Sequence, residues 1–352
     1  MPSKITQRIE RELQLPGLVD ALATRLPPSD LRSLLMEAYR ERASTIQPPA
    51  TLAHTDRDPL MTPSAVDARS LMAFDLAAFA AARGFDAVDL SPVCPLGASF
   101  SLGGTNQDHL LTTIRNAEVL GDSTIAMALE AARRRRSGEL VRLCASHRVI
   151  RLQPFDVPGF SPHFRLFGMV TAGRDRGSML FETDQLVEHT GVYLRLFRSL
   201  ASAGLTLRNP LVEFTDMSAL EAELARAGIT QEEVRDRIRA HRLGESERFL
   251  SERGIALPVD AAHPLLEARV LTPLRAEFPE AAVRVNQARL EGLGYYRGFA
   301  LRISPEAPDG NRYPVADGGF TDWTARLMAN RKERLLISGI GSEFVCKKYR
   351  AE

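Results

Sequence analysis

The most informative segment of the chain is Gly292-Leu293-Gly294-Tyr295-Tyr296-Arg297-Gly298, near its end. Two further glycine-containing stretches follow, Asp317-Gly318-Gly319-Phe320-Thr321-Asp322 and Leu335-Leu336-Ile337-Ser338-Gly339-Ile340-Gly341-Ser342-Glu343. We interpret the three stretches as two glycine-rich turns and a strand-glycine-helix junction. Glycine lets the backbone approach a ligand closely, and tyrosine supplies a flat wall with a polar tip. Together they predict a concave binding site.

Composition excludes several classes of protein. The chain has 352 residues, of which 44% are hydrophobic and 25% are charged, as in globular proteins of one large or two smaller domains. The net charge of +1 provides no overall attraction to nucleic acid or membrane, and no apolar run approaches the ~20 residues of a membrane span. Cys94, Cys144 and Cys346 are too far apart for a disulfide framework or a metal knuckle, so we expect a reducing cytoplasmic location.

The first quarter of the chain predicts helices and one strand. Residues 5–44 have the apolar spacing of two amphipathic helices, and the Pro-, Thr- and Asp-rich residues 45–63 are typical of a connecting loop. Residues 1–62 therefore form an N-terminal helical extension with its loop. A helix over 67–83 and a strand over 85–90 should follow, and Pro92 ends that strand.

The remainder predicts helices packed on a mixed or antiparallel sheet, which is an α+β fold. We expect helices over 122–136, 183–203 and 217–254, and strands over 141–153, 163–172, 283–303 and 334–338.

The order of these segments and the residues in their motifs resemble the catalytic core of histidyl-tRNA synthetase, a class II aminoacyl-tRNA synthetase. The turn at 292–296 resembles the family's Gly-Leu-Asp-Tyr-Tyr, which lines the histidine pocket. The helix-strand-proline unit at 67–92 resembles motif 1, the family's dimer interface, so the resemblance implies a homodimer. It covers about residues 66–350, and the core domain would span 63–352 with a helical insertion at 217–257.

Two further segments of the chain resemble motif 2, the pair of strands that binds ATP in this family. The strand ending at Arg151 resembles the first strand of motif 2, and the segment beginning at Phe164 resembles the returning strand. The resemblance implies ATP and Mg2+ as cofactors, Arg151 as the catalytic contact to the α-phosphate, and Phe164 stacked on adenine. A guanidinium suits phosphate, and an aromatic face accepts a base. Gln153 stands where the family orients adenine with a glutamate. The alternatives are core packing for Phe164 and a solvated strand end for Arg151.

The expected amino-acid pocket uses residues from separate segments. Asp122-Ser123-Thr124 resembles the family's acidic-x-Thr turn, in which Asp122 and Thr124 would bind an α-ammonium. Tyr295, Tyr296, Gly318 and Gly319 would complete the substrate contacts. An ordinary helix N-cap also accounts for Asp-Ser-Thr. The histidines show no metal-binding spacing, so we expect no metal site made by the protein alone.

The chain departs from the family where three arginines are expected. Glu291, Phe320 and Phe344 occupy those positions, and Arg289 or Lys347 could compensate. Net charge +1 and the lack of a resemblance to the anticodon-binding domain make tRNA an unlikely partner.

Two functions follow from this combination. The first is an enzyme that activates an amino acid or related small carboxylate with ATP outside translation. The second is a non-catalytic sensor, because the regulatory subunit of ATP phosphoribosyltransferase is similar to the synthetase core and has also lost catalytic arginines. Such a sensor would act on a regulated protein partner. The predicted retention of Arg151 and Phe164 favours the enzyme narrowly.

Overall fold

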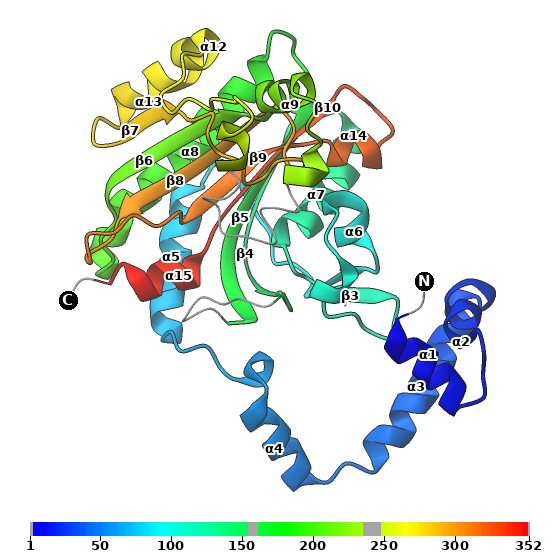
Figure 1. Ribbon diagram of the computed structural model, residues 1–352. Coiled ribbons are helices and arrows are strands. Elements are labelled where there is room, and N and C mark those ends of the chain that lie inside the picture. The colour runs from blue at the N-terminus through cyan, green and yellow to red at the C-terminus, as the bar shows by residue number, and fades with distance from the viewer. Residues whose placement is uncertain (1–2, 154–160, 235–247, 351–352) are drawn as a thin grey trace.

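A computed structural model describes residues 3–153, 161–234 and 248–350 and has an α+β architecture. Its main sheet has eight strands in the order β1-β4-β5-β10-β9-β8-β6-β7, and neighbours are antiparallel except the pairs β1–β4 and β6–β7 (Figure 1). The strands of this sheet are β1 (Asp86–Ala87), β4 (Val141–Ile150), β5 (His163–Arg174), β6 (Arg208–Asp216), β7 (Ala282–Val285), β8 (Phe299–Glu306), β9 (Ala316–Thr321) and β10 (Glu333–Ile340). A small second sheet pairs β2 (Val93–Pro95) with β3 (Ala117–Val119).

Helices cover both faces of the main sheet. The α-helices are α1 (Lys4–Glu12), α2 (Leu18–Asp20), α3 (Pro28–Ser44), α4 (Pro48–Arg57), α5 (Ala68–Ala81), α6 (Ala98–Gly103), α7 (Ser123–Arg134), α8 (Leu180–Leu200), α9 (Met217–Arg226), α12 (Pro264–Leu266), α13 (Thr272–Glu277), α14 (Trp323–Leu327) and α15 (Ser342–Lys348). Short 3-10 or π segments are η1 (Ala21–Arg25), η2 (Pro59–Met61), η3 (Gln107–His109), η4 (Arg135–Ser137), η5 (Ala201–Ala203) and η6 (Glu267–Leu271).

The alternation of side chains along β4 separates the two halves of the core. Leu143 and Ala145 pack in the cluster that includes α7 and Trp323, whereas Cys144 packs in the cluster that includes α5 and α8. This is the period of two expected for a strand buried on both faces. The sheet therefore carries a separate apolar layer on each side, and the candidate site belongs to the α7 side.

The helix-strand unit at 67–92 is present in a shorter form. Asp67 caps α5 by accepting from the amide of Arg69, as its sequence position predicts. The strand is limited to Asp86–Ala87, and one further backbone bond runs from Val88 N to Cys144 O. Strand β1 is an exposed edge strand that pairs on one side only.

Two predictions about loops are wrong. Residues 45–63 contain helix α4, in which the paired prolines at 48 and 49 occupy the first turn, where a missing amide costs nothing. Gly318 and Gly319 lie in strand β9 rather than in a turn. A Cβ on Gly318 would come within 2.6 Å of the carbonyl oxygen of Ile337, so the strand needs glycine for close approach to β10.

The predicted insertion at 217–257 is described only in part. Helix α9 begins after Asp216, whose carboxylate accepts from the amides of Ser218 and Ala219. The middle of the insertion lies outside the described residues, which resume at 248.

The N-terminal helices stand apart from the core. None of α1, α2, α3 and α4 has a buried residue, and Figure 1 shows them as an arm leading away from the sheet. Among the described residues, no helix combines the length and apolarity needed to cross a membrane.

A buried ion pair between Arg135, directly after α7, and Glu333, at the start of β10, connects the α7 layer to the sheet. Its two nitrogen-oxygen contacts measure 2.9 and 3.0 Å, and both side chains are almost fully buried. Arg135→Ala should lower the free energy of unfolding by about 3–5 kcal/mol because it leaves a buried carboxylate without its cation. Urea denaturation would measure this. The control Arg226→Ala removes an exposed ion pair and should cost less than about 1 kcal/mol; equal losses would contradict the prediction.

Candidate functional site

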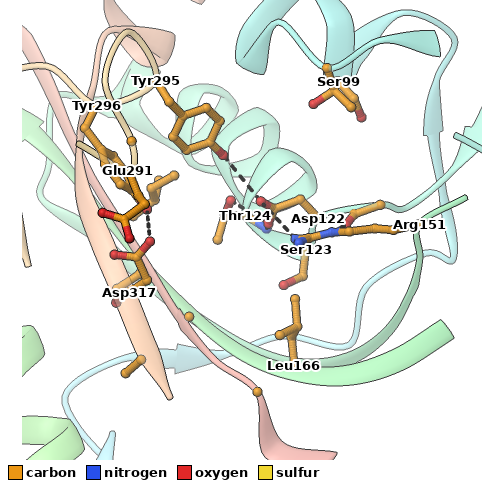
Figure 2. Close-up of a pocket in the computed structure, with 18 of the residues that line it drawn as sticks. Ser99, Asp122, Ser123, Thr124, Arg151, Leu166, Glu291, Tyr295, Tyr296 and Asp317 are labelled. Atoms are coloured by element: carbon orange, nitrogen blue, oxygen red, sulfur yellow. Dashed lines mark hydrogen bonds and ion pairs between the residues drawn. The ribbon is translucent and has the colours of Figure 1, made fainter. Parts of the chain in front are cut away.

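A cavity of about 740 Å3 opens on the α7 side of the sheet (Figure 2). This volume lies within the ~300–1,000 Å3 typical of small-molecule sites. Its lining comes from the start of α7, the residues after β4, the tyrosine turn, and strands β9 and β10. The three glycine-containing stretches from which we predict a binding site, at 292–298, 317–322 and 335–343, thus all contribute to one cavity.

Asp122 is both a helix cap and a pocket residue. One carboxylate oxygen accepts from the amide of Thr124 at 2.9 Å and from its hydroxyl at 2.7 Å. The other oxygen lies 3.4 Å from the hydroxyl of Tyr295, as Figure 2 shows. The capping and ligand-binding interpretations of this residue are therefore compatible, since each uses a different oxygen.

Arg151 reaches the same end of the pocket from the end of β4. Its Nε donates to the carbonyl of Gly121 at 2.8 Å, and its Nη2 lies 3.8 Å from Asp122. Its guanidinium also lies over the ring of Phe164, 5.2 Å from the centroid. Gln153 lines the cavity, whereas Phe164 is not among its lining residues. The predicted contacts of these three residues with ATP stay predictions.

The two tyrosines form adjacent walls. Both backbone amides donate to the carbonyl of Gly292 at 2.9 Å, and the rings meet edge to face at 5.0 Å. Tyr295 also packs on Trp323 at 5.6 Å, and the hydroxyl of Tyr296 donates to Asp317 at 3.3 Å. Burial raises the pKa of both phenols well above the ordinary value, and the neighbouring carboxylates add to this. Both hydroxyls are therefore donors at neutral pH.

Two glycines leave room for the Tyr296 ring. Gly292 has φ +91°, and a Cβ there would lie 2.5 Å from Tyr296. A Cβ on Gly319 would lie 2.6 Å from the same ring. Neither Gly318 nor Gly319 lines the cavity, whereas Ala316 and Asp317 immediately before them do. Within the structure, Gly319 acts by making space for a tyrosine.

Glu291 lines the cavity at the position where the resemblance to the synthetase family predicts an arginine. Burial alone would raise the pKa of Glu291, but Arg302 at 2.9 Å lowers it below the ordinary value, so the side chain is ionised at neutral pH. Arg289 does not line the cavity: its Nε, Nη1 and Nη2 contact the carbonyls of Glu291 and Leu301 and the carboxylate of Asp317.

The other two substituted positions do not face the pocket. Phe320 lies in the opposite apolar layer, where its ring meets Phe181 edge to face at 6.2 Å. Phe344 packs edge to face with Tyr313 at 5.7 Å. Lys347 is exposed on α15 and is not among the lining residues.

Asp317, Ser123 and Ser338 are among the lining residues that sequence reasoning missed. Asp317 is the first residue of the Asp-Gly-Gly stretch, and its alternation with Gly318 in a strand would have placed it on the pocket face. Ser123 has a buried hydroxyl with no hydrogen-bond partner in the described part of the chain. Ser338 is fixed from behind, because its hydroxyl contacts His189 at 2.8 Å and Tyr193 at 2.9 Å.

The charged groups that line the cavity are mainly acidic. Among the described lining residues they are the carboxylates of Asp122, Glu291 and Asp317 and the guanidinium of Arg151. Such a lining offers several acceptors for ammonium groups and few donors for anions. No group of three or more His, Cys, Asp or Glu side chains suited to a metal ion occurs within residues 3–153, 161–234 and 248–350.

Comparison with known proteins shows that the fold is similar to that of histidyl-tRNA synthetases. No protein-family model and no curated protein matches the chain. Among solved structures, an ATP phosphoribosyltransferase regulatory subunit/histidyl-tRNA synthetase from Bacillus halodurans has a TM-score of 0.57 and 14% identity, covering 81% of this chain and 80% of that one.

Two further structures give the same result. A histidine–tRNA ligase subunit from Alicyclobacillus acidocaldarius has a TM-score of 0.59 and 15% identity, covering 82% of this chain and 96% of that one. A histidyl-tRNA synthetase from Nostoc has a TM-score of 0.57 and 13% identity, covering 82% and 74%. The chain therefore has a class II synthetase-like fold, similar to these catalytic cores at low sequence identity.

Gly319→Ala tests whether close backbone approach positions Tyr296. The new methyl group would collide with the ring and should lower the free energy of unfolding by about 1–3 kcal/mol. Gly339→Ala on β10 is the control, because its nearest contact would be 3.7 Å. That variant should be neutral or slightly stabilising, by up to about 1 kcal/mol. Thermal and urea unfolding would compare them, and a neutral Gly319→Ala would contradict the role assigned to this glycine.

Proposed function

We propose that the protein binds an amino acid or related small carboxylate in this pocket and acts as a ligand-binding, regulatory-type relative of the synthetases. The observation that carries this proposal is the adjacency of Asp122 and Arg151, whose nearest charged atoms are 3.8 Å apart. That separation is longer than a hydrogen bond, so neither group saturates the other. An acid and a guanidinium side by side match the ammonium and carboxylate of an amino acid.

The surroundings of this pair support the same ligand. The Tyr295 hydroxyl and Thr124 hold the Asp122 carboxylate in place, and Gly121 holds the Arg151 guanidinium. Groups fixed in this way lose little conformational entropy when a ligand binds.

The pocket fits ATP less well. A triphosphate needs several cationic or amide donors, as in other phosphate-binding sites. Here Arg151 is the guanidinium that lines the cavity, whereas Glu291 and Asp317 would repel phosphate oxygens. We therefore assign no reaction step to ATP or Mg2+. Adenylate formation remains the competing function, and Arg151 beside Gln153 is the observation in its favour.

Isothermal titration calorimetry and pyrophosphate exchange separate these functions. We expect at least one amino acid to bind to the full-length protein, no binding of ATP with Mg2+, and no amino-acid-dependent exchange. Exchange with any member of an amino-acid panel would show that the protein is an activating enzyme. Failure of every amino acid and related small carboxylate to bind would contradict both functions.

Asp122→Asn tests the ammonium contact. Asparagine remains a good N-cap, so the helix should persist while the charge is lost. Affinity for the bound amino acid should fall about tenfold or more, because a hydrogen bond to a charged group contributes roughly 1.5–3 kcal/mol. Asp108→Asn, at an exposed position outside the lining, is the matched control. Unchanged binding by Asp122→Asn would contradict the assignment.

We also propose a cytoplasmic homodimer that uses the 67–92 unit and does not act on tRNA. Met72 and Leu76 are one helical turn apart on α5 and are 65% and 72% exposed. Burying this pair against a second copy would remove apolar surface from water. The described cysteines are free and buried, which suits a reducing compartment.

Leu76→Glu should disrupt such a dimer, because a carboxylate would have to be buried in its interface. Light scattering after size exclusion should report twice 38.8 kDa for the unaltered protein and 38.8 kDa for the variant. Leu52→Glu on α4 is the control because Leu52 is similarly exposed, at 65%, but lies outside this surface. A monomeric unaltered protein would contradict the proposal.

A further inference from the structure

We propose that the ligand of this pocket carries a second cationic nitrogen group, bound by Glu291 and Asp317, so that the preferred class is diamino acids such as lysine or ornithine. This inference rests on the proposed function, since it uses Asp122 and Arg151 for the α-ammonium and carboxylate. It adds a recognition site for the ligand's distal end.

Two ion pairs, Arg289–Asp317 and Arg302–Glu291, form one wall of the cavity and are oriented with their acids toward it. Asp317 has a side chain 52% exposed, whereas its partner Arg289 is 1% exposed. Glu291 lines the cavity, and its partner Arg302 lies outside the lining and is more buried. A ligand entering the cavity therefore meets carboxylates and finds the arginines behind them.

Arg289 offers the cavity no donor group, because its nitrogens already donate to oxygens of the protein. Its Nε, Nη1 and Nη2 are each directed to an oxygen of the protein, at 3.0, 2.9 and 2.5 Å. The backbone amide of Gly318 also donates to Asp317 at 3.0 Å. A ligand carboxylate or phosphate at this end would face like charge, whereas an ammonium has only donors and suits the remaining lone pairs of the acids.

The tyrosine pair separates two acidic ends of one cavity. Tyr295 contacts Asp122 through its hydroxyl, and Tyr296 contacts Asp317 through its own. Because the rings are adjacent at 5.0 Å, the two carboxylates lie on neighbouring parts of the lining; Figure 2 shows Asp122 with Arg151 on one side and Glu291 with Asp317 on the other. An amino acid with an aliphatic chain and a distal ammonium can contact both ends along the aromatic walls.

Lysine and norleucine are the matched probes, because they share the α-amino acid and a four-carbon side chain and differ in the distal ammonium. Calorimetry with the full-length protein should show lysine or ornithine binding about tenfold or more tightly than norleucine. Glu291→Gln and Asp317→Asn should each reduce that preference for lysine over norleucine. Asp309→Asn, at an exposed position outside the lining, should leave both affinities unchanged.

The outcomes distinguish this inference from the function it depends on. Norleucine binding as tightly as lysine and ornithine would overturn the second cationic site and leave amino-acid binding intact. If neither probe nor any other amino acid bound, both proposals would be overturned. The comparison in the unaltered protein needs no variant, so destabilisation of Asp317→Asn through its buried partner would not obscure the result. Retained preference in a folded Glu291→Gln variant would remove Glu291 from the site.

Discussion

The pocket depends on one packing constraint, the contact between the Tyr296 ring and glycine backbone on two sides. Gly292 and Gly319 come from segments separated in sequence, yet a Cβ at either would lie within 2.6 Å of that ring. Interiors this closely packed tolerate little added volume. The tyrosine turn is thereby fixed against β9, and both phenol hydroxyls are aimed at carboxylates of the cavity. Gly319, which the sequence suggests as a ligand contact, therefore acts by leaving room for a side chain that lines the site.

The architecture is shared with known structures, whereas the function depends on the charges that line the cavity. The fold is similar to histidyl-tRNA synthetase cores at 13–15% identity, which shows shared architecture and leaves the chemistry to the site itself. Glu291 faces the cavity, and Arg289 is occupied by protein oxygens. Asp122 and Arg151 lie in an arrangement that suits a zwitterion. Recognition of a small amino compound needs only this much, whereas stabilising a reacting phosphate takes several donors, and Arg151 is the one guanidinium among the described lining residues.

Much of the fold was predictable because its periodic patterns are long. The helix after Asp122, the strand pair β4–β5 and helix α8 all carry apolar residues at regular spacing, and the structure contains each. The glycine pair in β9 was misassigned because local propensity favours a turn. Tertiary contact with β10 overrides that propensity, since no side chain fits at Gly318. Helix α4 was missed for a related reason: prolines suggest a loop unless they occupy the first helical turn.

The site was less predictable than the fold. The co-location of Asp122, Arg151 and the tyrosines in one cavity follows the order of the motifs, and the structure brings them together. The inward direction of Arg289, toward the carbonyls of Glu291 and Leu301, does not follow from the sequence order. The opposite faces of Asp317 and Phe320 follow from strand alternation, but only once 316–321 is known to be a strand. Residue identity alone leaves Arg289 as a possible replacement for the missing arginine, whereas in the structure its hydrogen bonds go to protein oxygens.

A crystal structure of the protein soaked with both lysine and ATP with Mg2+ would decide between a binding protein and an activating enzyme. We expect lysine in the cavity, with its α-ammonium at Asp122, its carboxylate at Arg151 and its distal ammonium at Glu291 and Asp317. We also expect no ordered triphosphate there. An ATP molecule bound with its α-phosphate at Arg151 and its adenine on Phe164 would contradict the central claim and restore an activating enzyme.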